Sequence, residues 1–127
     1  MNLLTIPEDD FDLILSGHKT NIVKPGKTGV GEGTCYIRTS ARPSDMIEVY
    51  VKLVENVPFG ELTILHATEA GFPGLEIMHA RLLERWPHLT FDDEMSIITF
   101  KVLRSDAGGG SAGGNTIKCR VKTPKPF

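Results

Sequence analysis

An alternation of apolar and polar residues over positions 47–54 constrains the fold of this chain more than any other stretch. Between Ile47 and Leu53 every odd position is aliphatic, and the even positions hold Glu48, Tyr50 and Lys52. Because successive side chains of an extended chain point to opposite sides, this spacing puts the aliphatic residues on one face. The stretch is therefore predicted to be a half-buried strand of an antiparallel or mixed sheet.

Further elements are expected on both sides of that strand. Strands are predicted over residues 3–6, 20–23, 34–40 and 95–103, and helices between Pro7 and Gly17, from Thr63 to near Gly71, and from Gly74 to Trp86. The last helix carries an apolar stripe that is expected to face the core, made of Leu75, Met78, Leu82 and Trp86. Segment 25–33, with four glycines, is expected to be a loop, and the A-R-P-S-D cluster at 41–45 a turn. Two helices stand together before the last strand, and this order favours a small α+β barrel or curved sheet over a doubly wound fold.

Length and composition are typical of one globular domain. The chain has 127 residues, 40% of them hydrophobic, which is enough for a core. It contains no run of about 18 apolar residues and its start lacks the pattern of a secretory signal, so neither a membrane span nor export is expected. Cys35 and Cys119 are too few and too far apart for a disulfide framework or a metal site. We therefore expect a cytoplasmic protein with reduced thiols and without a metal or cofactor.

The C-terminal part of the chain differs in composition from the rest. Residues 107–115 read A-G-G-G-S-A-G-G-N, which is typical of a flexible linker, and a segment of alternating apolar and basic residues follows. The folded domain is therefore expected over residues 1–103, with the linker and a basic tail in residues 104–127.

Positive charge gathers in two zones of a chain whose net charge is −2. Residues 17–44 contain five basic residues and Glu32 as the one acid, and residues 104–127 contain five basic residues and Asp106. The first zone includes segment 14–24, in which a short amphipathic run ends at Gly17 and Lys19 and Lys24 follow. Cations on a turn between a helix and a strand suit a phosphate, a carboxylate or a nucleobase, so an anionic partner is expected here.

Four sequence blocks in order resemble the ASCH domain family. They are I-L-S-G-H-K-T-N-I-V-K from residue 14, V-P-F-G-E-L-T-I-L-H-A-T-E-A-G-F from residue 57, the helix L-E-I-M-H-A-R-L-L-E-R-W-P from residue 75, and M-S-I-I-T-F-K-V-L from residue 95. The resemblance implies a PUA-like β-barrel of about five or six mixed strands flanked by three helices, with a cleft beside the Gly-x-Lys motif. It also implies a function in recognising RNA or modified nucleosides. Some small bacterial members hydrolyse N4-acetylcytidine with a lysine, a threonine and a glutamate, and another member is a ribonuclease.

Residue by residue, the match to the hydrolases is incomplete. Lys19 matches the motif lysine, but the threonine that follows it by three positions is Ile22 here. The base at the end of the strand is Lys24 instead of arginine, and the glutamate aligns with Ala70. Glu69 stands one position earlier, and one residue turns a helical side chain by about 100°.

Three functions remain open from the sequence. The first is a site for RNA, a nucleotide or a modified nucleoside, whose ligand-binding residues are predicted to be Lys19, Asn21, Lys24, Tyr36 and Arg38. The second is hydrolysis of an acylated pyrimidine nucleoside or of RNA, with Lys19 and Glu69 as catalytic residues. In that reading Lys24 and Lys27 would supply the charge that lowers the pKa of Lys19. The third is a protein-interaction or inhibitor module that uses the basic tail. The sequence leaves the ligand and the oligomeric state undetermined.

Overall fold

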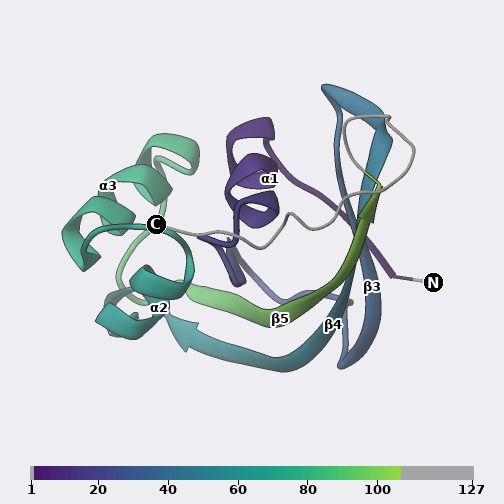
Figure 1. Ribbon diagram of the computed structural model, residues 1–127. Coiled ribbons are helices and arrows are strands. Elements are labelled where there is room, and N and C mark those ends of the chain that lie inside the picture. The colour runs from purple at the N-terminus through teal and green to yellow at the C-terminus, as the bar shows by residue number, and fades with distance from the viewer. Residues whose placement is uncertain (1, 107–127) are drawn as a thin grey trace.

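A computed structural model describes residues 2–106, which form a curled five-stranded sheet with three α-helices (Figure 1). The elements in chain order are β1 (Asn2–Thr5), α1 (Glu8–Leu15), β2 (Asn21–Pro25), β3 (Gly33–Thr39), β4 (Arg42–Pro58), the 3-10 turn η1 (Phe59–Glu61), α2 (Ile64–Glu69), α3 (Leu75–Arg85) and β5 (Glu94–Asp106). The strand order is β1-β3-β4-β5-β2. The β1–β3 pair is parallel and the other pairs are antiparallel, which confirms a mixed α+β fold consistent with a PUA-like barrel.

The two longest strands give the sheet its curl. β4 has 17 residues and β5 has 13, and their pairing shifts register at Glu48/Val49 and again at Val51/Leu53. Such shifts bend a strand and increase its twist. The long β4 also corrects one sequence prediction, because Arg42 to Asp45 belong to the strand and the turn is confined to Ser40 and Ala41. Thr39 pairs directly with Arg42, so a two-residue connection closes the hairpin.

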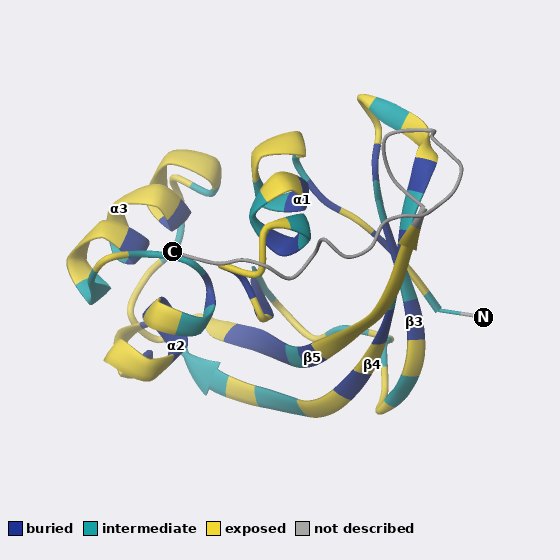
Figure 2. Ribbon diagram, in the orientation of Figure 1, coloured by how far each residue is buried: buried dark blue, intermediate teal, exposed yellow. Residues whose placement is uncertain are grey.

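α1 lies inside the curl, on the face of the sheet that we call the inner face (Figure 1). Phe11 and Ile14 of this helix are buried in one cluster with Ile37, Val49 and Phe100 of the sheet. Each of these three sheet residues lies between two neighbours that are exposed or half-buried, as the alternating bands of Figure 2 show. The alternation predicted for β4 is thus confirmed from Ile47 to Val51.

α2 and α3 pack on the opposite face, which we call the outer face, and only at one end of it. Their core joins Met78 and Leu82 to Val23 of β2 and to Met95 and Ile97 of β5. Met78 and Leu82 are buried, and the two other stripe residues, Leu75 and Trp86, are partly buried against them. The predicted core-facing stripe of this helix is therefore confirmed. The rest of the outer face carries no helix among the described residues.

The last strand extends beyond the expected domain end. β5 continues through residues 104–106, so these residues belong to the sheet and not to a tail. The predicted linker at 107–115 and the basic segment after it lie outside the described residues. Within residues 2–106, no helix combines the length and the apolar character that a membrane crossing requires.

Candidate functional site

The connection between α1 and β2 docks on the C-terminal end of α2. Three consecutive residues donate to three main-chain carbonyls there: Lys19 Nζ to Ala70 O at 3.2 Å, Thr20 N to Glu69 O at 2.6 Å, and Asn21 Nδ2 to His66 O at 3.2 Å. The last carbonyls of a helix have few partners within the helix and favour donors and cations; of these three, His66 O also accepts from Ala70 N at 3.0 Å. The lysine motif therefore has a structural partner almost fifty residues away in sequence.

Two glycines make this docking geometrically feasible. Gly17 has a φ of +83° just after α1, and Gly71 has a φ of +92° just after α2, both in the left-handed region that favours glycine. A Cβ atom on Gly71 would lie 3.1 Å from the main-chain oxygen of His18. The end of α2 is thus close to the turn that precedes Lys19 because position 71 has no side chain.

Lys19 is a buried cation, with 5% of its surface exposed. Burial lowers the pKa of its ammonium group below the ordinary value of 10.5, Asp10 opposes this shift, and Arg85 adds to it. The neighbouring cation is therefore Arg85 of α3, and not Lys24 or Lys27 as expected from sequence. Arg85 and Asp10 lie 3.8 Å apart and join α3 to α1 beside the lysine. The Phe72 ring centre lies 5.8 Å from Lys19 Nζ, a contact that favours the charged form.

Asn21 lies beside Lys19 and is completely buried. Its amide nitrogen bonds His66 O, but its carbonyl oxygen Oδ1 has no hydrogen-bond partner within residues 2–106. Lys19 Nζ has three donor hydrogens and one acceptor among the same residues, the oxygen of Ala70. A buried carbonyl without a partner costs about 1–3 kcal/mol. The site therefore combines spare donors on Lys19 with a spare acceptor on Asn21.

The predicted catalytic carboxylate does not pair with Lys19. Glu69 is partly buried and its main-chain oxygen accepts from Thr20, but no ion pair joins its carboxylate to Lys19 among the described residues. The aligned position, Ala70, instead gives its main-chain oxygen to the lysine. Ile22, which stands where the hydrolases have threonine, is buried in the α1 core on the other side of the strand.

The other predicted ligand-binding residues lie away from Lys19. Lys24 is partly buried near the end of β2 and shares the register side of Ile22, so it faces away from Asn21. Tyr36 and Arg38 are partly buried on the outer face of β3, because they alternate with Cys35 and Ile37 of the inner core. β4 and β5 separate β3 from β2. The structure thus brings Lys19 and Asn21 together, while the roles of Lys24, Tyr36 and Arg38 stay predictions.

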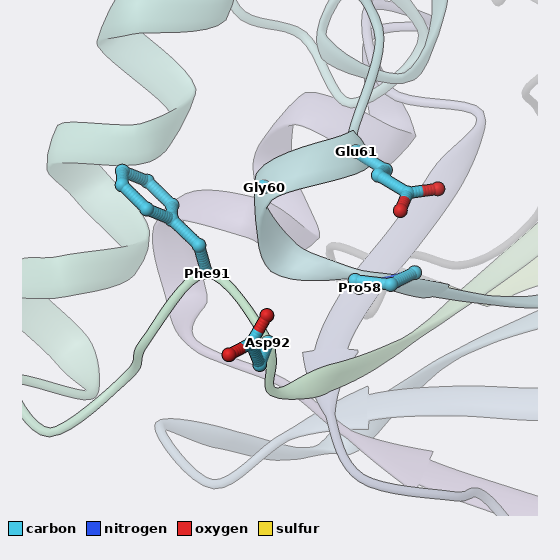
Figure 3. Close-up of a pocket in the computed structure, with 5 residues that line it drawn as sticks. All are labelled: Pro58, Gly60, Glu61, Phe91 and Asp92. Carbon is cyan, nitrogen blue, oxygen red and sulfur yellow. The ribbon is translucent and has the colours of Figure 1, made fainter.

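An open hollow of about 380 Å³ occurs elsewhere, between η1 and the segment before β5 (Figure 3). Its lining is Pro58, Gly60, Glu61, Phe91 and Asp92, and none of the predicted site residues is among them. The polar side chains in this lining are both acidic, so the hollow has the wrong charge for a phosphate. Within residues 2–106, no group of three histidine, cysteine or acidic side chains is arranged to hold a metal ion.

Arg85, Asp10 and the Ala70 carbonyl were not identified from sequence. From the sequence, Arg85 and Asp10 are charged residues of amphipathic helices, which are usually exposed to solvent. A main-chain carbonyl is present in every residue, so the sequence cannot indicate which one accepts a hydrogen bond. Only the packing of α1 against α3 and the end of α2 brings them to Lys19.

The curled mixed sheet, with one helix inside and two at its end, is an α+β domain consistent with a PUA-like barrel. No protein-family model matches the sequence, and no curated protein does. Solved structures match by fold. A DUF984-family protein of Enterococcus faecalis superposes with a TM-score of 0.63 and 16% identity, covering 88% of this chain and 86% of that one.

Two proteins described as ASCH also match. An ASCH domain from Lactobacillus crispatus has a TM-score of 0.61 and 16% identity, over 80% of this chain and 79% of its own. An ASCH protein of Zymomonas mobilis has a TM-score of 0.56 and 10% identity, over 81% of this chain and 70% of its own. The chain therefore has an ASCH-domain fold, as its sequence blocks predict.

Proposed function

We propose that this chain binds RNA, a nucleotide or a modified nucleoside, and that Lys19 and Asn21 contact the base. One observation carries the proposal: a buried ammonium group with donors to spare stands beside a buried amide oxygen without a partner. The sequence resemblance to ASCH domains, which implies nucleoside recognition, supports the same conclusion.

The two groups complement the edge of a nucleobase. A base presents donors and acceptors side by side on its Watson–Crick edge, where proteins read unpaired bases. An acceptor of the base would receive a hydrogen from Lys19 Nζ, and a donor of the base would satisfy Asn21 Oδ1. Both atoms would then exchange an unfavourable buried state for a complete set of hydrogen bonds.

The test is calorimetric titration of the full chain with pyrimidine ribonucleoside monophosphates, comparing wild type with Lys19→Met. Methionine keeps an unbranched side chain and removes the charge. A hydrogen bond to a charged group contributes about 1.5–3 kcal/mol, so affinity should fall about 10- to 150-fold. Lys27→Met is the matched control, because Lys27 is exposed in the loop after β2.

Thermal unfolding of each variant shows whether it still folds, and Lys19→Arg, which keeps the cation, gives a second measurement at the same position. Unchanged affinity in a folded Lys19→Met protein would contradict the proposal.

A hydrolase is the second candidate, and the lowered pKa of Lys19 favours it. A lysine acts as a base only as the neutral amine, and burial increases the fraction in that form. If the chain is a hydrolase, wild type should consume N4-acetylcytidine and Lys19→Met should not. Absence of turnover at high enzyme concentration would remove this candidate.

A further inference from the structure

The outer face of the sheet is uncovered away from α2 and α3, and its residues follow from the strand register. Tyr36 pairs with Glu48, and Glu48 pairs with Arg104; Tyr50 pairs with Lys101. Paired residues share a face, and on β3 and β4 these residues alternate with residues of the inner core. We call this set the outer-face surface: Tyr36, Arg38, Glu48, Tyr50, Lys101 and Arg104.

This surface leads to the Lys19–Asn21 site. Asn21 pairs with Thr99, and Phe100 N donates to Thr20 O at 3.0 Å, so the antiparallel pairing continues past the end of β2. Asn21 therefore occupies the outer face of β2, and Thr99 and Lys101 lie on the same face of the neighbouring β5, where Lys101 pairs with Tyr50. Lys19 precedes β2 and lies two positions before Asn21 in the chain.

The charge of the outer-face surface suits a polyanion. Arg38 and Lys101 have no carboxylate within ion-pair distance in the part of the chain that the structure describes. Arg104 bonds Glu48 at 2.8 Å, yet its side chain is 73% exposed. The three cations thus outnumber the single acid on this surface. This excess of positive charge suits the phosphates of a nucleic-acid backbone.

Two tyrosines lie diagonally among these cations. Tyr50 pairs with Thr34, two residues from Tyr36, and Tyr50 is 44% exposed. Diagonal neighbours on adjacent strands have Cα atoms about 7–8 Å apart. Exposed aromatic rings on a sheet stack unpaired bases, about two or three per four-stranded sheet, while nearby cations hold the backbone.

We propose that a single-stranded nucleic acid lies across the outer-face surface and presents one nucleotide to Lys19 and Asn21. Its bases stack on Tyr36 and Tyr50, and its phosphates contact Arg38, Lys101 and Arg104. This inference rests on the proposed function of the Lys19–Asn21 site, and it specifies that the natural ligand is a strand and not a free nucleoside.

The experiment measures binding of the full chain to a fluorescent eight-nucleotide pyrimidine strand, and separately to a nucleoside monophosphate. The strand should bind more tightly than the monophosphate. Tyr50→Ala should weaken strand binding about 5- to 150-fold, the loss typical of a base–aromatic stack, and leave monophosphate binding unchanged. Tyr50→Phe, which keeps the ring, is the matched control.

Salt dependence tests the phosphate contacts. With about three phosphates neutralised, the logarithm of the affinity should fall with the logarithm of salt concentration with a slope of about −2, at about −0.7 per contact. Lys101→Ala should reduce the magnitude of this slope by about 0.7, the value of one phosphate contact. Lys27 is an exposed cation in the loop after β2, and Lys27→Ala should leave the slope unchanged. Ribose and deoxyribose strands are compared, and the tighter one identifies the natural sugar.

Two results would overturn this inference and leave the proposed function intact. In the first, the strand binds wild type no more tightly than the monophosphate does; in the second, the strand binds folded Tyr50→Ala as tightly as it binds wild type. Equal binding of a duplex would also overturn it, because paired bases cannot stack on the tyrosines. If wild type binds neither the strand nor the monophosphate, both the inference and the proposed function are refuted.

Discussion

Lys19 and Arg42 come from the same basic stretch of sequence and show how differently two cations can be used. Each lies over a phenylalanine: Lys19 Nζ is 5.8 Å from the centre of the Phe72 ring, and the Arg42 guanidinium is 5.1 Å from that of Phe11. Both also join segments far apart in sequence, Arg42 to Asp12 of α1 and Lys19 to Ala70 at the end of α2. From residue type and position alone the two look equivalent.

Their charge partners separate them. Arg42 has three carboxylates within reach, with Glu8 at 3.5 Å, Asp45 at 3.7 Å and Asp12 in a direct hydrogen bond that raises the pKa of the arginine. Lys19 has a main-chain carbonyl and no carboxylate at ion-pair distance within residues 2–106, and burial lowers its pKa. A cation already neutralised by its own chain stabilises the fold, whereas an unneutralised buried one is available to a ligand.

The largest effect expected from this comparison is a reversal between two variants. Arg42→Met leaves the buried Asp45 without its cation, so the midpoint of thermal unfolding should fall by several degrees while nucleotide affinity stays at the wild-type level. Lys19→Met should do the opposite, with affinity lost and the fold retained. Calorimetric titration and thermal unfolding of both proteins check this, and an Arg42→Met protein with lost affinity but unchanged stability would break the distinction.

The sequence predicted the elements well because their signals are local. The alternation over 47–54 and the stripe on α3 depend on neighbours a few residues apart. The stripe is confirmed, and the alternation is confirmed from Ile47 to Val51 but ends at the register shift before Leu53, which is exposed. The prediction of a turn at 41–45 was wrong. It rested on the general preference of proline and serine for turns, whereas the end of the hairpin is set by the pairing of Thr39 with Arg42, which local residue preferences do not reveal.

The site was predictable only in part, for a related reason. Lys19 and Asn21 were identified from a motif. Their hydrogen-bond acceptors, Ala70 and His66, and the neighbouring cation Arg85 are far away in sequence and were not identified. The place of Tyr36 and Arg38 relative to Lys19 could not be predicted, because it depends on the strand order. β4 and β5 lie between β3 and β2, and the ligand-binding roles of the tyrosine and the arginine stay predictions.

A smaller effect is expected at Asn21, which tests whether its unpartnered oxygen serves the ligand. Asn21→Leu keeps the size of the side chain and removes both polar atoms. His66 O retains a donor, Ala70 N at 3.0 Å, so the unfolding free energy should change by less than about 1 kcal/mol. Affinity for a nucleotide should fall about 5- to 10-fold, the equivalent of one neutral hydrogen bond.

Denaturant unfolding and titration of the same sample measure the two quantities at Asn21. A variant that is strongly destabilised yet binds as well as wild type would show that Asn21 is purely structural.

The smallest effect expected is a pH dependence that separates Lys19 from exposed lysines. Because burial lowers its pKa below 10.5, the folded protein releases this proton at a pH where the unfolded chain still holds it. Between the lowered pKa and 10.5 the unfolded state binds more protons, so the stability of wild type relative to Lys19→Met should rise with pH. Asp10, which opposes this lowering, and Arg85, which adds to it, are the charged groups that act on the pKa of Lys19.

Nucleotide affinity should move in the opposite direction over the same pH window, because the neutral amine loses both the charge and one donor. Rising stability with falling affinity, in one protein and one pH range, is a signature that a solvated lysine cannot produce. The comparison of wild type with Lys27→Met supplies the reference at an exposed lysine. A difference between wild type and Lys19→Met that does not change with pH would mean that Lys19 is solvated in the native protein, and the contrast with Arg42 would then be lost.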